Sequence, residues 1–295
     1  MMIDRFLEYM RHERNRSELT IKSYEEDLRA FETYFKGLEI DGLTWETIDA
    51  DIIRGWMEGM MDKRNTATSI NRRLSALRSF YRFALSRGLV PSDPAHLVKG
   101  PKKRRPLPQY LREVDMDRLI DDIPWDCNNF NNVRARTIIL LFYETGIRLA
   151  ELASLDDTSV DFIQKEIKVH GKRDKERLIP LGGEMVDSLL GYIKMRDERV
   201  TRKNVALFVT EKGERMKHFQ IRNEVKRCLA HVTTMKKKSP HVLRHTFATA
   251  MLNHEAGLES VKKLLGHESL ATTEIYTHTT FEQLKKTYSN AHPRA

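Results

Sequence analysis

The chain has 295 residues, of which 40% are hydrophobic and 32% are charged, and its formal net charge is +9. This length suits two domains of ordinary size, and the composition is typical of a globular protein rather than a disordered one. The longest strongly apolar run, Thr137 to Tyr143, is too short to span a bilayer, and the N-terminus lacks the basic-then-apolar order of a signal peptide. Cys127 and Cys228 stand alone in no metal-ligand spacing, so we expect a reduced, cytoplasmic protein with no membrane partner.

The first domain is predicted to be helical and to cover residues 1–98. One helix is expected to start at a Thr20 cap and to carry Leu19 on its apolar stripe. The best-formed helix covers residues 68–88 and places Leu85 at the end of its apolar stripe. Its opposite face carries arginines and small hydroxyl residues, which suit close contact with a phosphate backbone. The DNA contacts predicted on this helix are Arg72, Ser75, Arg78 and Arg82.

A basic, proline-rich linker is predicted over residues 99–108. Five prolines fall in the segment PSDPAHLVKGPKKRRPLP, which shows no helical periodicity. Residues 59–105 together carry twelve basic side chains against only two acidic ones. A solvated charged surface is one interpretation of this excess, and a nucleic-acid surface is the other. On the second interpretation, the linker supplies four further DNA contacts, Lys102, Lys103, Arg104 and Arg105.

The second domain is predicted over residues 109–295 and is mainly helical. The exception is residues 160–181, where apolar and polar residues alternate on both sides of a Gly-Lys-Arg-Asp turn. This pattern indicates a small antiparallel sheet, and residues 207–210 suggest a further short strand. The fold class is therefore mainly α with a small antiparallel β-sheet.

The stretch HVLRHTFAT places His241 and Arg244 one helical turn apart, after a Ser-Pro helix start. Two histidines four residues apart, here His241 and His245, suggest zinc in other sequences. Here no glutamate follows His241, and a cationic arginine precedes His245, so a zinc hydrolase is disfavoured. An ordinary structural histidine is the alternative interpretation. We predict no metal at this position.

Two other cations have both structural and functional interpretations. Arg148 follows a helix-breaking glycine, and it could pair with Glu144 or Glu151 or could face a substrate. Lys172 lies in the predicted charged turn, where it could be an ordinary exposed lysine.

A histidine and a tyrosine near the C-terminal end have the same ambiguity. Gly266 is a natural left-handed helix stop, so His267 is expected to project from a sharp corner. Tyr276 follows nine residues later and, taken alone, is more typical of a packing residue than of a nucleophile.

Together these six side chains supply what phosphoryl transfer needs without a metal. Arginines bind non-bridging oxygens with charge-assisted hydrogen bonds and stabilise the extra negative charge of the transition state. A histidine can assist deprotonation of the attacking hydroxyl, and a lysine can protonate the leaving oxygen. A tyrosine oxygen can be a covalent nucleophile. No cofactor is required for this chemistry.

The order Arg…Lys…His-x-x-Arg…His…Tyr resembles the tyrosine recombinase (phage integrase) family over essentially the whole chain. The segments TGIRLAEL, HGKRDKERLIPL, PHVLRHTFAT and LLGHESLATTEIYTH are similar to its Xer subgroup. The resemblance implies a SAM-like helical core-binding domain followed by a catalytic domain. It also implies that Tyr276 attacks a DNA phosphodiester to give a 3′-phosphotyrosyl link, while Arg148 and Arg244 bind the phosphate. Lys172 would be the general acid, and His241 and His267 would assist proton transfer.

The implied activity is site-specific DNA recombination through a Holliday junction, and it needs neither metal nor ATP. The implied partner is a double-stranded DNA recombination site. The implied location is the cytoplasm, in association with the nucleoid. The family acts as a tetramer, of one kind of subunit or two, in which the C-terminal segment, here about 281–295, docks on a neighbour. Chromosome dimer resolution and mobile-element integration or inversion both remain open. The alternative from another class is a catalytically silent DNA-binding accessory subunit.

Overall fold

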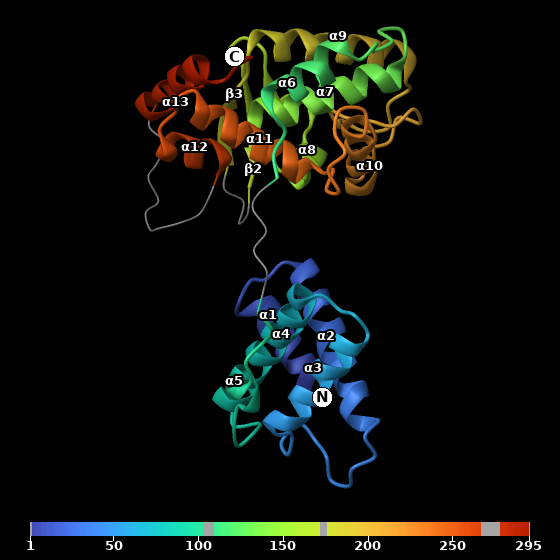
Figure 1. The fold of residues 1–295 in the computed structure, drawn as a ribbon, viewed down its shortest axis with the longest axis vertical. Coiled ribbons are helices and arrows are strands. Elements are labelled where there is room, and N and C mark those ends of the chain that lie inside the picture. The colour runs from blue at the N-terminus through green and yellow to red at the C-terminus, as the bar shows by residue number, and fades with distance from the viewer. Residues whose placement is uncertain (1, 103–108, 172–175, 267–277, 295) are drawn as a thin grey trace. The chain divides into compact units, whose positions relative to one another are not determined.

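The computed structural model describes residues 2–102, 109–171, 176–266 and 278–294, and for residues 278–283 it describes the backbone alone. The chain forms two compact units, Met1–Pro106 and Leu107–Ala295. Both units are mainly helical, and the second contains a small antiparallel sheet, which confirms the predicted fold class (Figure 1). No helix in the described ranges is long and apolar enough to cross a membrane.

The N-terminal unit packs its helices around an aromatic core. Phe31 lies against Trp45 and Trp56, and Phe80 completes the contact with Trp45. Side chains of Ser17, Asp49 and Thr66 cap the starts of the second, third and fourth helices. The elements are α1 (Met2–His12), α2 (Glu18–Lys36), α3 (Ala50–Asp62), α4 (Ala67–Ser86) and α5 (Pro94–Leu97).

Three local predictions for this unit were wrong. The cap of α2 is Ser17 rather than Thr20, because the Ser17 hydroxyl accepts the Thr20 amide at 3.4 Å. Leu19 is 79% exposed and Leu85 is 44% exposed, so neither belongs to the buried stripe. Both lie near helix ends, where helical spacing alone does not show which residues the neighbouring helices cover.

The C-terminal unit is built around one buried helix, α7 (Phe130–Thr145), which packs against α9, α10 and α11 (Figure 1). Its remaining elements surround this helix or belong to the sheet. They are α6 (Glu113–Asp117), η1 (Arg118–Asp122), α8 (Leu149–Ser154), η2 (Asp157–Ser159), β1 (Val160–Asp161), β2 (Glu166–His170), β3 (Glu176–Pro180), α9 (Gly183–Arg199), α10 (His218–Leu229), α11 (Pro240–Asn253), α12 (Leu258–Leu265) and α13 (His278–Ala291).

The sheet has the order β1-β2-β3 with both pairings antiparallel, as the alternating pattern predicted. Ile167 lies opposite Ile179 in the register, and both are buried on the face toward the core. The strand expected at residues 207–210 does not form. Val209 makes only a single antiparallel bridge to Arg215.

The C-terminal residues pack on the rest of the C-terminal unit of their own chain. The Tyr288 hydroxyl donates to the Glu144 carboxyl at 3.0 Å, and the His292 ring lies 3.2 Å from the Tyr143 carbonyl oxygen. Arg294 pairs with three carboxylates, those of Asp117, Asp121 and Glu184. The end of α13 is therefore docked in cis in the single chain.

Glu144 makes the stability of this contact dependent on pH. The side chain is fully buried, and burial raises its pKa from 4.5 to about 8, although hydrogen bonds from Tyr288 and Gly182 oppose the shift. The folded state therefore holds a proton that the unfolded state releases, and stability should fall as pH rises between 4.5 and about 8.

We expect the Glu144→Gln variant to lose this dependence, because glutamine keeps the hydrogen bonds and cannot titrate. The measurement is urea unfolding of both proteins at intervals from pH 5 to pH 9. The difference between the two unfolding free energies should change by about 1.4 kcal/mol per pH unit inside that window. Parallel curves for the two proteins would show that Glu144 is ionised in both states.

Candidate functional site: an arginine pair at the end of α12

The first arginine of the site is held at the corner between α7 and α8. Gly146 ends α7 in the left-handed conformation (φ 57°), and Arg148 caps the start of α8. The amide and the guanidinium of Arg148 both donate to the Glu151 carboxylate, each at 2.8 Å. A second guanidinium nitrogen donates to the carbonyl of Gly266 at 2.7 Å. The side chain of Arg148 remains 38% exposed, so it can still reach an anion.

The second arginine is deeper in the same place. Arg244, on the first turns of α11, is 8% exposed and donates to the carbonyl oxygens of Gly146 at 2.5 Å and Leu265 at 2.6 Å. Burial lowers its pKa to about 10, with a further contribution from the charge of Arg148. The guanidinium is still protonated at neutral pH. Because Arg148 and Arg244 bond to the adjacent carbonyls of Gly266 and Leu265 at the end of α12, we call them the arginine pair.

His241 lies one helical turn before Arg244 and is exposed. Partial burial lowers its pKa below 6.5, and the nearby charges of His245, Arg244, Lys237 and Arg222 lower it further. A lowered pKa keeps the imidazole neutral at physiological pH, so its free nitrogen can accept a proton. His241 therefore has the protonation state that a general base needs.

Glu151 is the anion that organises this cationic cluster. Burial by itself would raise the pKa of Glu151, but hydrogen bonds and charge from Arg177, together with Arg148, outweigh burial and lower the pKa to about 2. The carboxylate is therefore ionised at all physiological pH values. It neutralises only part of the positive charge of three arginines, and the remainder favours an anionic ligand.

The structure brings together three of the six residues predicted from the sequence, Arg148, His241 and Arg244. The other three, Lys172, His267 and Tyr276, lie outside the described residues. Within the described part of the chain, no group of three or more histidine, cysteine, aspartate or glutamate side chains is arranged to hold a metal ion.

Sequence reasoning missed four residues near the arginine pair. Glu151 was considered only as a partner of Arg148, although its position three residues into a helix is a capping signal. Arg222 and Lys237 lie close enough to His241 to affect its pKa. Lys237 is only four residues before His241 in a run of lysines, whereas Arg222 is distant in the sequence. No sequence signal distinguishes Arg177 from an ordinary strand arginine, because its burial depends on the tertiary fold.

The predicted DNA-binding residues on α4 have different environments. Arg72 donates to Asp27 at 2.8 Å, and Arg78 donates to the carbonyls of Ala95 at 3.2 Å and Val98 at 2.6 Å. Arg78 therefore stabilises the end of the N-terminal unit. Ser75, Arg82 and Lys102 are exposed, whereas Lys103, Arg104 and Arg105 lie outside the described residues.

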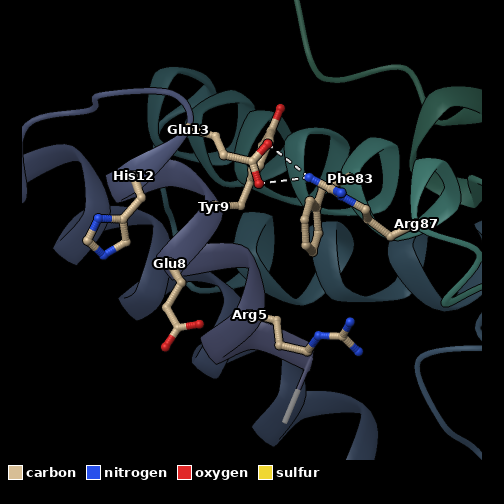
Figure 2. Close-up of a pocket in the computed structure, with 7 residues that line it drawn as sticks. All are labelled: Arg5, Glu8, Tyr9, His12, Glu13, Phe83 and Arg87. Atoms are coloured by element: carbon tan, nitrogen blue, oxygen red, sulfur yellow. Dashed lines mark hydrogen bonds and ion pairs between the residues drawn. The ribbon is translucent and has the colours of Figure 1, made fainter.

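A shallow hollow of about 270 Å³ lies between α1 and α4 in the N-terminal unit (Figure 2). Arg87 pairs with Glu13 across it at 2.7 Å, and Glu8 and Arg5 also line it. Its charges are mixed and partly paired with each other. It contains none of the residues predicted to carry function.

Two family models match the chain along most of its length. The phage integrase family matches residues 109–283, and the N-terminal SAM-like domain of phage integrases matches residues 3–88. Tyrosine recombinase XerC of Pelotomaculum thermopropionicum is 37% identical, covering 99% of this chain and 98% of its own length. XerC of Shewanella oneidensis is also 37% identical, covering 99% of this chain and 93% of its own length.

A solved structure has the same fold. The XerH site-specific recombinase bound to palindromic difH substrate, a post-cleavage complex, aligns with a TM-score of 0.68 at 23% identity, covering 94% of this chain and 81% of that one. The chain belongs to the phage integrase family and is a site-specific tyrosine recombinase.

Proposed function

We propose that this chain is an Xer-type recombinase that breaks and rejoins DNA through a 3′-phosphotyrosyl intermediate on Tyr276. The observation that carries the proposal is the convergence of Arg148 and Arg244 on the last carbonyls of α12. Two guanidinium groups fixed side by side can bind both non-bridging oxygens of one phosphodiester. His241 is close to Arg244, and His267 follows Gly266 directly in the sequence.

The chemical step requires no external energy source. The Tyr276 oxygen attacks phosphorus, its proton passes to a base for which His241 has the right protonation state, and the bond to the 5′ oxygen breaks. Lys172 gives a proton to that oxygen. The phosphate carries one more negative charge in the transition state, which the arginine pair stabilises. The tyrosyl phosphodiester keeps the energy of the broken bond, so the reverse attack by a 5′-hydroxyl reseals a strand.

The Tyr276→Phe variant tests the proposal most directly. It should bind DNA but form no covalent adduct on a nicked suicide substrate, because phenylalanine has no nucleophilic oxygen. Denaturing gel electrophoresis of the protein with labelled DNA measures the adduct. The matched control is Tyr288→Phe: Tyr288 is 1% exposed and bonded to Glu144, so it should retain adduct formation. An adduct at wild-type yield with Tyr276→Phe would overturn the assignment.

The proposed partner is a double-stranded recombination site. The XerH structure contains a difH substrate, the Tn1549 integrase structure contains circular intermediate DNA, and both share the fold of this chain. In addition to α4 and the linker, Arg222 and Lys237 supply positive charge near His241. We propose that these residues contact phosphates next to the cleaved one.

We also propose that the protein acts as a tetramer at a chromosome dimer resolution site. The support is its full-length similarity to XerC proteins. In the tetramer, the C-terminal segment that docks in cis here would make the same contacts with a neighbouring subunit. Mapping the covalent cleavage positions on genomic DNA separates this role from mobile-element integration, because a resolution site occurs once per chromosome.

A further inference from the structure

Three consecutive carbonyl groups at the end of α12 each accept a hydrogen bond from a different arginine. Arg177 donates to Leu264 at 3.0 Å, Arg244 to Leu265 at 2.6 Å, and Arg148 to Gly266 at 2.7 Å. The last carbonyls of a helix have no partner within the helix and carry partial negative charge. The end of α12 therefore fixes the spacing of the three guanidinium groups.

Arg177 is about as buried as Arg244 and much more buried than Arg148, and all three of its guanidinium nitrogens donate to other groups of the protein. Its side chain is 6% exposed, and it binds both oxygens of Glu151, at 2.7 and 2.9 Å. Glu151 in turn binds the amide and the guanidinium of Arg148. Arg177, on β3, thus connects the start of α8 with the end of α12.

The charges explain what Arg177 contributes. If Glu151 faced Arg148 alone, the carboxylate would cancel the charge that Arg148 offers to a phosphate. Arg177 neutralises Glu151 from the buried side, so the arginine pair keeps close to two positive charges. A phosphodiester carries one negative charge in the ground state and approaches two in the transition state, and this matches the charge of the pair.

Gly266 also packs closely against the side chain of Arg177. Gly266 is left-handed (φ 61°), and an added Cβ would lie 3.2 Å from Cζ and Nη1 of Arg177. The guanidinium therefore lies directly against the backbone of the residue whose carbonyl binds Arg148. A displacement of Arg177 would shift both the carbonyls and the carboxylate that hold the pair.

We infer that Arg177 is a positioning residue for DNA cleavage, which acts through Glu151 and the end of α12 without touching the phosphate. This inference rests on the proposed function. The informative variant is Arg177→Lys, which keeps a buried positive charge but cannot bind both Glu151 oxygens and the Leu264 carbonyl together. The matched control is Arg196→Lys, because Arg196 is also buried and binds Asp157 and the Leu207 carbonyl, away from the arginine pair.

We expect Arg177→Lys to lower the single-turnover cleavage rate of saturated protein–DNA complex by about 10²-fold, as for an ångström-scale misplacement. Its Kd for the DNA site should stay near that of the wild type. Arg196→Lys should leave the cleavage rate close to wild type at a temperature where both variants are folded. A rate for Arg177→Lys equal to that of the control would overturn the inference.

A second substrate separates positioning from loss of stability. A methylphosphonate at the cleaved position removes one negative charge, so its cleavage depends less on the arginine pair. The defect of Arg177→Lys should therefore be much smaller on this substrate, whereas a variant that is merely unstable would show the same defect on both. An equal defect on both substrates would reject the inference, while adduct formation by the wild type and none by Tyr276→Phe would still support the proposed function.

Discussion

Replacing Arg244 with alanine should lower the rate of covalent DNA cleavage by about 10²- to 10³-fold, because one preorganised donor to the transition-state charge is lost. Its guanidinium is buried and fixed by two carbonyls, so it needs no reorganisation when the charge develops. The measurement is single-turnover adduct formation on the nicked substrate, at protein concentrations that saturate the DNA. Binding affinity should change much less, because the rest of the basic surface is unaltered.

The neighbouring histidine provides the control for this experiment. His245 is exposed on the same helix, and no catalytic role is assigned to it. His245→Ala should retain cleavage close to the wild-type rate. If it lost as much activity as Arg244→Ala, a site built on His241 and His245, such as the zinc site considered from the sequence, would return to consideration.

Gly146→Ala should strongly destabilise the C-terminal unit. The left-handed backbone costs a residue with a Cβ about 1–2 kcal/mol. The added Cβ would also lie 2.5 Å from Cδ1 of Phe247 and 2.7 Å from Cδ2 of Leu265. Overpacking of this kind costs a further 1–3 kcal/mol or so. We therefore expect the free energy of unfolding to fall by about 2–5 kcal/mol, the sum of these two effects.

Urea unfolding of the full chain checks this expectation, with Gly183→Ala as the reference. Gly183 begins α9, and an added Cβ there has no heavy atom within 4 Å, so alanine should be neutral or slightly stabilising. Cleavage should also fall in Gly146→Ala, because the Gly146 carbonyl accepts a hydrogen bond from Arg244. A loss below about 1 kcal/mol would contradict both effects, because the backbone strain alone should cost at least that much.

Much of the fold could be predicted because its signals are local. Alternation over residues 160–181 predicted the sheet, since a half-buried strand presents every second side chain to the core. The helix of Arg244 was predicted from a Ser-Pro start, and the corner at Gly146 from its glycine. The errors at Leu19 and residues 207–210 have one cause. Neither helical spacing nor a short apolar run shows which neighbouring element will cover the residues concerned.

The catalytic candidates could be proposed from the sequence because their order and spacing match a family pattern. Their environment could not be predicted. From the sequence, Arg148 could pair with either Glu144 or Glu151. In the structure it pairs with Glu151, whereas Glu144 is buried and accepts a hydrogen bond from Tyr288. That choice depends on how α8 and α13 pack on α7.

By itself, the sequence was enough to predict the fold class, to propose the catalytic side chains and to indicate the family. These inferences depend on residue type, periodicity and spacing. Only the tertiary structure decided that three arginines from α8, β3 and α11 meet at the last carbonyls of one helix. The physical reason is that burial and hydrogen bonding between distant segments set both the geometry and the charge of a site. Neither is encoded in any single stretch of the chain.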